Sequence, residues 1–179
     1  MGSRVVFVAV LSLFCIALFA PRHARVATAP VLLTKTNSTR ALAVESTSLL
    51  AEPFWAMTPV PFSQDNRTRV MLFATNLTLL PGETVTATAE DGNHIQYPLK
   101  VEYTGGVPSL SGVTSVIVRL HDDLGDVGDV LVGITVHGMT SNRVRIGIGH
   151  VGGGPPDDAW PRPGVSPPRP AGPAVGRPR

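Results

Sequence analysis

The sequence contains almost no cysteine, since Cys15 is the one thiol in 179 residues. A single cysteine cannot close a disulfide within the chain, and Cys15 lies in an apolar N-terminal run that we expect to be cleaved off. The mature chain would then have neither disulfides nor thiolate metal sites, so its stability has to come from a hydrophobic core. Aromatic residues are also few, at 6% of the chain, which leaves little material for a sugar-binding platform.

Helical periodicity is absent as well, because no segment keeps apolar residues at the three- and four-residue spacing of an amphipathic helix. Apolar and polar residues instead alternate over 128–149, which predicts two strands joined by a loop at 138–142. One side of the first strand holds Val130, Val132, Ile134 and Val136, and its other side holds Leu131, Gly133, Thr135 and His137. The second strand places Val144, Ile146 and Ile148 opposite Arg143 and Arg145, so we expect a hairpin with one dry face.

Five more extended segments precede this hairpin and are separated by turn residues. They cover 41–49, 69–77, 84–90, 94–103 and 114–120. Proline, glycine, asparagine and aspartate gather in the intervals at 80–83, 90–93, 104–106 and 122–129. About seven strands without helices predict an all-β fold, an immunoglobulin-like antiparallel β-sandwich with disordered flanks. We expect this domain to cover residues 40–151.

The N-terminal residues have the pattern of an export signal. Arg4 precedes an unbroken apolar run over 5–20, and small residues at 27 and 29 suit cleavage after Ala29, although Pro30 follows the cut. We therefore predict a signal peptide at 1–29, and a secreted, periplasmic or cell-surface protein. If uncleaved, the same segment would be a short N-terminal anchor, because spanning a bilayer takes about 20 apolar residues. The Thr-rich residues 30–39 are predicted to form a spacer.

The C-terminal residues 152–179 are dominated by proline, glycine and arginine. Such a composition buries too little apolar surface to offset the entropy of folding, so we predict a disordered tail with polyproline II character. Trp160 is its one large apolar residue. A Pro-rich ligand for an aromatic groove is the functional alternative to a plain linker.

The net charge of +2 hides an uneven distribution. Residues 40–151 contain seven basic and eleven acidic side chains, so this part carries 7 − 11 = −4. The basic surplus belongs to the flanks. An acidic folded part cannot supply the positive patch that phosphate binding requires, so we expect no nucleic-acid partner.

The acidic stretch 121–129 is the sharpest candidate for a metal site. Its oxygen ligands would be Asp122, Asp123, Asp126 and Asp129, which makes calcium the metal to consider. The candidate is weak because the spacing is not that of an EF-hand, and a solvated interstrand turn explains the same residues. Histidines 94, 121, 137 and 150 stand singly, without the spacing that places two imidazoles on one helix face.

Motifs for catalysis are missing. The chain contains no GxSxG elbow, no phosphate-cradling glycine loop and no paired catalytic carboxylates, so we predict that it is not an enzyme and needs no cofactor. The alternative is a small hydrolase, which would need a buried carboxylate beside His94 or His137 in a cleft.

Three segments carry a resemblance to a known family: RTRVMLFATNLTLLPGETVTATAEDG (67–92), YPLKVEYTGGVPSLSGVTSVIVRL (97–120) and GDVGDVLVGITVHGMTSNRVRIGIGHVGGGPPDD (125–158). The shared marks are NL before a turn, the passage VRLHDDLGDVGDVLV and the hairpin HGMTSNRVRI. The chain resembles an exported Ig-like module of acidobacterial secreted proteins and, more loosely, IPT/TIG-type and Solibacter-type C-terminal domains. This resemblance covers most of residues 40–158. It implies an immunoglobulin-like sandwich that is usually appended to larger exported proteins and rarely catalytic.

The expected function is therefore a non-catalytic exported module with a structural or protein-binding role at the cell surface or outside the cell. Function would then lie in loops, with 105–112, 122–129 and 138–142 as candidates, or in exposed strand edges. A membrane contact is expected only if the N-terminal segment stays uncleaved. The alternative is a carbohydrate-binding sandwich, whose aromatic candidates are Trp55, Tyr97, Tyr103 and Trp160.

Overall fold

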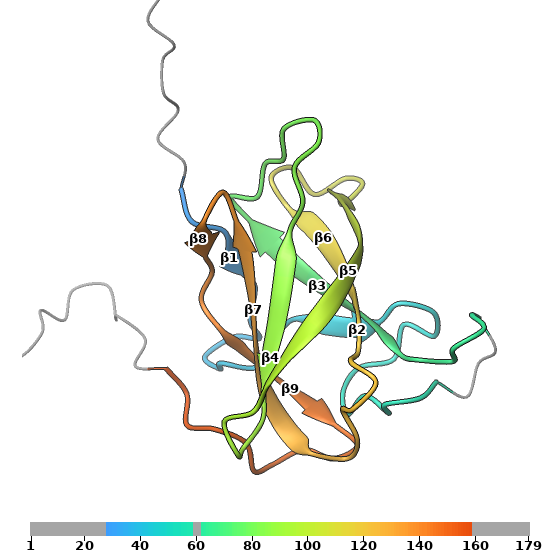
Figure 1. Ribbon diagram of the computed structural model, residues 1–179. Coiled ribbons are helices and arrows are strands. Elements are labelled where there is room, and N and C mark those ends of the chain that lie inside the picture. The colour runs from blue at the N-terminus through green and yellow to red at the C-terminus, as the bar shows by residue number, and fades with distance from the viewer. Residues whose placement is uncertain (1–27, 59–61, 159–179) are drawn as a thin grey trace, which may run out of the picture.

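The computed structural model describes residues 28–58 and 62–158. These ranges form nine strands and contain no helix (Figure 1). The strands are β1 Val31–Leu32, β2 Ala43–Glu45, β3 Arg69–Thr75, β4 Thr86–Glu90, β5 Gln96–Gly106, β6 Thr114–Arg119, β7 Gly128–Val136, β8 Met139–Thr140 and β9 Val144–Ile148. The predicted all-β fold with about seven main strands is confirmed, since β1 and β8 are only two residues long.

The strands form two layers that share β5. In the first sheet β1 and β2 pair with β3, β3 pairs with β6, and β6 pairs with the second half of β5. In the second sheet the first half of β5 pairs with β4, β4 with β7, and β7 with β8 and β9. β5 passes from one sheet to the other between Leu99, the last residue paired with β4, and Lys100, the first paired with β6, and a bulge follows between Val101 and Tyr103. Figure 1 shows β4 and β7 in front of β3 and β6.

The chain before β3 closes the open side of this arrangement. Bridges Arg40–Arg145 and Phe54–Ile148 run parallel, so the connection around β2 lies along β9 while β1 and β2 pair with β3. The N-terminal segment thus pairs with both sheets, through β1 and β2 with β3 and through its bridges with β9. Together with the strand order, this is the connectivity of an immunoglobulin-like sandwich in a near-barrel form.

The core lies between the two sheets and is aliphatic. Alternate residues of each long strand point inward, as the period of two requires. The buried inward set includes Val70, Leu72, Val116, Val118, Val130, Val132, Ile134, Val144, Ile146 and Ile148, each at most 1% exposed. The predicted dry side of the hairpin is therefore confirmed.

The hairpin differs from the prediction in two respects. Its turn is only His137 and Gly138, both with positive φ, because a two-residue type I′ turn matches the twist of the flanking strands. The predicted loop 138–142 instead contains β8. The opposite side of β7 is not open either: Leu131 is only 1% exposed, for a reason described below.

The domain extends beyond the predicted limits at both ends. Residues 30–39 are not a spacer, since they contain β1, and Leu32 is part of the core at 2% exposure. The side-chain amide of Asn142 satisfies the backbone of β1 as a neighbouring strand would. It accepts a hydrogen bond from Leu32 N at 2.8 Å and donates one to Leu32 O at 3.0 Å. At the other end, residues 152–158 pack on the second sheet.

Residues 1–27 of the predicted signal peptide and 159–179 of the predicted tail, with Trp160, lie outside the described residues. Within 28–58 and 62–158 no helix has the length and hydropathy needed to cross a bilayer.

Candidate binding surfaces

The four aspartates of the calcium hypothesis point to different partners. Their neighbours are Arg119 for Asp122, His121 for Asp123, His150 for Asp126, and Arg40 for Asp129. Among the described residues, no group of three or more His, Cys, Asp or Glu side chains is placed to hold a metal ion. The stretch 121–129 is thus a connection whose carboxylates fix neighbouring segments.

Asp129 shows what these carboxylates do. It is 3% exposed, and its Oδ2 lies 2.7 Å from Arg40 Nη2 and 3.6 Å from Arg145 Nη1. Arg40 also donates to Glu52 at 2.9 Å, and Glu52 accepts from Gly147 N at 3.0 Å. This network joins β7, β9 and the N-terminal connection, so its role is to close the sandwich.

The four described histidines each meet one carboxylate. His94 lies 2.7 Å from Glu90, His137 lies 2.9 Å from Glu83, His121 lies 3.6 Å from Asp123, and His150 contacts Asp126. His137 Nε2 is also 3.0 Å from Thr78 O, so it ties the β7–β8 turn to the β3–β4 connection. These are four separate pairs at loop positions.

Two of the candidate loops lie at one end of the sandwich. The β3–β4 connection, the β5–β6 connection and the β7–β8 turn gather at the top in Figure 1. The first two line a pocket of about 490 Å³, largely through polar and backbone groups, from Asn76 to Thr78 and from Gly106 to Thr114. The third candidate, 122–129, follows β6 and lies at the opposite end.

The outward side of the first sheet is apolar. Val44, Met71, Ile117 and Tyr103 occupy one cross-strand row over β2, β3, β6 and β5. Leu42 and Phe73 extend this row, because they alternate with the buried Ala43 and Leu72. We call these six residues the apolar face. None belongs to the core, Leu42 is 46% exposed and Tyr103 is 51% exposed.

Gly105 helps Tyr103 to lie flat on this face. The two residues are separated by one position on β5 and therefore point to the same side. A Cβ at Gly105 would overlap the Tyr103 hydroxyl and ring. The missing side chain lets the aromatic ring extend along the strand, which widens the apolar face.

An ionic cluster borders the apolar face at one end. Arg69 and Arg119 face each other on β3 and β6, and Asp65 lies 2.6 Å from Arg69 and 2.5 Å from Arg119. Hydrogen bonds from Arg69, Ser63 and Arg119 hold the pKa of Asp65 well below its usual range. Arg69 also pairs with Glu102 at 2.9 Å and lowers the pKa of that carboxyl. Two cations and two anions balance, so this border carries no net charge.

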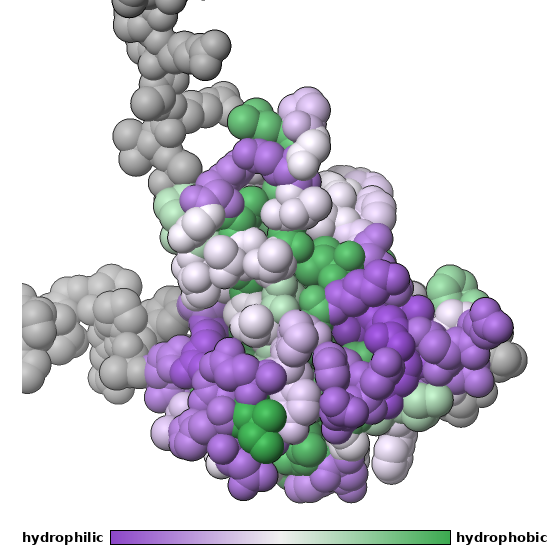
Figure 2. Space-filling model, viewed as in Figure 1, coloured by the Kyte–Doolittle hydropathy of each residue, from purple (hydrophilic) through white to green (hydrophobic). Residues whose placement is uncertain are grey.

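The outward side of the second sheet is polar by contrast. Its exposed or half-exposed positions include Thr86, Thr88, Thr135 and Thr140. Figure 2, which views the molecule from this side, is mainly purple and white over the sheet. Leu131 also points to this side, and it is buried.

Residues 152–158, here called the strap, cover that position. Asp129 N donates to Gly152 O at 2.9 Å, and Arg145 Nη2 donates to Pro155 O at 2.7 Å. Arg145 also pairs with Asp157 at 2.5 Å, and Arg143 pairs with Asp158 and, at 2.5 Å, with Glu90. Pro155 is buried, and Gly154 lies against Gly92 and Asp129, so the strap crosses the outer side of the sheet over Leu131.

The strap's aspartates are held in the ionised form. The hydrogen bond from Arg143 lowers the pKa of Asp158. Burial opposes ionisation of Asp157, but hydrogen bonds from Arg145 and Thr39 outweigh it and its pKa is also lowered. The glycine triplet 152–154 has positive φ at every position, which lets the chain turn back after β9.

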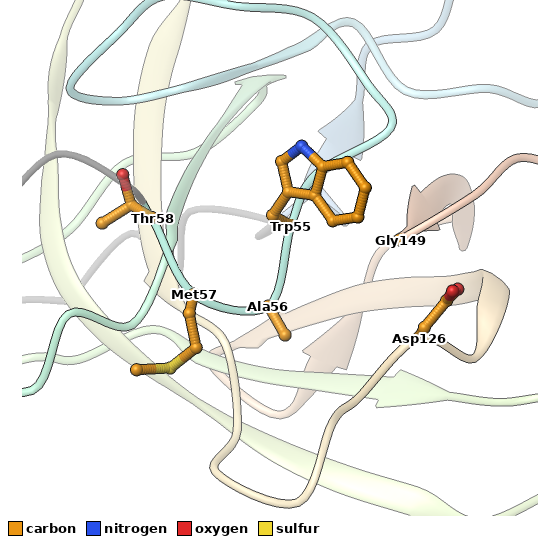
Figure 3. Close-up of a pocket in the computed structure, with 6 residues that line it drawn as sticks. All are labelled: Trp55, Ala56, Met57, Thr58, Asp126 and Gly149. Atoms are coloured by element: carbon orange, nitrogen blue, oxygen red, sulfur yellow. The ribbon is translucent and has the colours of Figure 1, made fainter.

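Trp55 lines an open pocket of about 560 Å³ at the other end of the sandwich (Figure 3). The other lining residues are Ala56, Met57, Thr58, Asp126 and Gly149. Trp55 is 63% exposed and Met57 is 49% exposed. The carboxylate of Asp126 approaches from the β6–β7 connection, across the pocket from the indole in Figure 3.

The aromatic candidates for sugar binding do not share a surface role. Tyr97 packs against the core, and its hydroxyl donates to Asp91 at 3.1 Å. Burial and this bond raise the pKa of Tyr97. Trp55 and Tyr103 are exposed on different parts of the molecule, one in the pocket and one on the apolar face.

Comparison with known proteins adds no family to this description. No protein-family model matches the chain, and no curated protein matches its sequence.

The apolar face was not among the predicted sites, although the sequence held a signal for it. In 69–77 and 114–120 apolar residues occupy both sides of the strand, as Met71 and Phe73 do against Leu72 and Ala74. A two-sided apolar strand in a two-layer fold implies that its outer side meets something. The Trp55 pocket could not be found this way, since Asp126 and Gly149 are remote in sequence.

Proposed function

We propose that this protein is a non-catalytic exported Ig-like module that binds a protein partner through the apolar face. The observation that supports this best is the apolar row Val44, Met71, Ile117 and Tyr103 on the outer side of the first sheet, none of which belongs to the core. Contiguous apolar surface with a polar border is typical of protein interaction sites.

The contrast between the two outer sides supports the proposal. On the second sheet, the apolar Leu131 is covered by the strap, and threonines occupy the open positions. On the first sheet, Leu42 and Tyr103 are about half exposed, and the other four residues of the apolar face are partly exposed. Burying such side chains contributes roughly 25 cal/mol per Å², so a partner would be stabilised there.

The neutral ionic border fits the same role. Arg69 and Glu102 are already paired with each other, so a partner meets polar groups whose charges are satisfied. The apolar centre then supplies most of the binding energy, and Tyr103 is the candidate anchor, since tyrosine is among the residue types enriched at interface hot spots. Export and a location at the cell surface or outside the cell rest on the N-terminal pattern at 1–29.

Site-specific photocrosslinking in the exporting cell tests this function. A benzophenone amino acid is placed at Tyr103 and, as the matched control, at Thr88, which is exposed on the outer side of the second sheet. We expect a discrete adduct with one protein from position 103 and none from position 88. No adduct from 103, or the same adducts from both positions, would contradict the proposal.

A substitution gives the second arm of the test. Ile117→Glu places a charge in the centre of the apolar face, and Thr88→Glu places one on the polar side. The adduct at position 103 is expected to disappear with Ile117→Glu and to persist with Thr88→Glu. Near-identical melting curves for the two variants would establish that folding is not the cause.

A further inference from the structure

The Trp55 pocket is preformed. Phe54 N donates to Gly147 O and Gly149 N donates to Phe54 O, both at 2.8 Å, so the backbone beside Trp55 is fixed to β9. Gly149 leaves room for the Asp126 carboxylate, since a Cβ there would overlap it. An exposed indole and a carboxylate therefore stand on opposite walls of the pocket without a cost of reorganisation (Figure 3).

These walls suit one ligand chemistry in particular. The indole of Trp55 and the thioether of Met57 offer apolar surface against which proline rings pack, as in aromatic grooves that bind polyproline II segments. Asp126 offers a carboxylate for a cation, and a guanidinium also stacks well on an indole. The pocket thus fits a proline-rich segment that contains an arginine.

The same chain contains such a segment. We propose that Pro168-Arg169-Pro170, from the part of the chain beyond the described residues, docks in the Trp55 pocket of its own molecule. Its prolines lie on Trp55 and Met57, and Arg169 pairs with Asp126. The inference goes beyond the partner-binding function, which uses a different surface.

Charge complementarity supports this occupant. Residues 159–179 contain four arginines and no acidic residue, whereas residues 40–151 carry 7 − 11 = −4. The pocket itself contributes Asp126 to this acidic part. The opposite charges attract each other and so favour the docked state. Tethering favours it further, because the effective concentration of a tethered ligand is in the millimolar range.

The strap determines which Pro-Arg-Pro segment reaches the pocket. Arg143 holds Asp158, and Gly149 at the pocket is six residues further along the chain, or about 20 Å along an extended strand. A polyproline II chain advances about 3.1 Å per residue, so a chain of three residues reaches about 9 Å from Asp158 and a chain of ten residues about 31 Å. The chain between Asp158 and Pro161-Arg162-Pro163 is therefore too short to bring that segment to the pocket. The chain between Asp158 and Pro168-Arg169-Pro170 is long enough.

This difference in reach provides a matched pair of variants. The readout is acrylamide quenching of Trp55 fluorescence in the purified protein, in which Trp160→Phe leaves Trp55 as the sole tryptophan. Arg169→Glu and Arg162→Glu make the same change in the same Pro-Arg-Pro context. Circular dichroism and melting curves are recorded for each variant, so that loss of folding is distinguished from loss of docking.

We expect Arg169→Glu to raise the quenching constant by about twofold, the increase produced when a cover present half of the time is lost. Asp126→Asn is expected to act in the same direction, and Arg162→Glu to leave the constant unchanged. Equal quenching in all forms would overturn the inference. Quenching that falls as the protein concentration rises would also overturn it, because the segment would then come from a second molecule.

Discussion

Arg69 on β3 and Arg119 on β6 are direct cross-strand neighbours, and their guanidinium groups share the carboxylate of Asp65. Like charges in this position destabilise a strand pair unless a counter-charge separates them. Asp65 supplies that charge from the connection before β3. The ionic border of the apolar face is therefore also a fastening between two central strands.

Replacing Asp65 tests this fastening. Asp65→Asn keeps the size of the side chain and removes its charge, so the two arginines repel each other and the melting temperature is expected to fall. Asp123→Asn is the control, because Asp123 is highly exposed and its neighbour is His121 at 3.6 Å. Thermal unfolding followed by circular dichroism measures both. Equal melting temperatures for the two variants would show that the shared carboxylate contributes nothing.

Acid should weaken the fold through the same kind of group. The pKa values of Asp65, Glu102, Glu90 and Asp158 are all lowered in the folded protein by hydrogen bonds from neighbouring side chains. Their stabilising contribution is present in full above the unfolded values of about 3.9 for Asp and 4.3 for Glu, and is lost as the pH falls through the lower folded values. Urea unfolding at pH 7, 5 and 3.5 is expected to give similar free energies at 7 and 5 and a lower one at 3.5. A free energy that rises on acidification would contradict the assigned directions.

The core and the apolar face should respond differently to the same truncation. Ile146→Ala removes a core side chain and is expected to cost about 2–5 kcal/mol of unfolding free energy. Ile117→Ala removes an equal volume from the apolar face, where water already has access, and should cost about 1 kcal/mol. Urea titrations of the purified variants measure both. Comparable losses would mean that the apolar face is packed as tightly as the core.

Two neighbouring glycines separate the effect of space from that of backbone strain in the strap. Gly154 and Gly153 both have positive φ, but a Cβ at Gly154 would overlap the Asp129 carbonyl, whereas one at Gly153 meets nothing within 4 Å. Gly153→Ala should therefore cost only about 1 kcal/mol of local strain. Gly154→Ala should release the strap, which hydrogen exchange over residues 150–158 would report as faster exchange. Similar exchange in both variants would count against the strap's close packing.

Most of the fold was accessible from the sequence because alternation and turn residues report directly on strands. The segments 69–77, 84–90 and 114–120 became β3, β4 and β6 with small changes at their ends. The limits of the domain were harder to predict, because residues 30–39 and 152–158 show no strand pattern and could be judged only by their composition. Leu32 is bound to Asn142, 110 positions away, and Pro155 is bound to Arg145, 10 positions away. Partners at such separations leave no local pattern in the sequence.

The candidate sites were less accessible for the same reason. Four aspartates within eight residues look like a cation site, yet Asp122, Asp126 and Asp129 turn to Arg119, His150 and Arg40 in different parts of the fold. The apolar face could be anticipated in part from the two-sided strand β3. The Trp55 pocket could not, because its walls come from three separate connections.

The strap also decides where the polypeptide enters and leaves the sandwich. Ala29, Pro30 and Val31 line the same small pocket as Arg143, Asp157 and Asp158, and Thr39 donates to Asp157 at 2.9 Å. Both ends of the described chain therefore lie on the same side of the sandwich (Figure 1). A pull applied between them would load the bond between Thr39 and Asp157 and the ion pair between Arg143 and Asp158 before it reached the strands of the core.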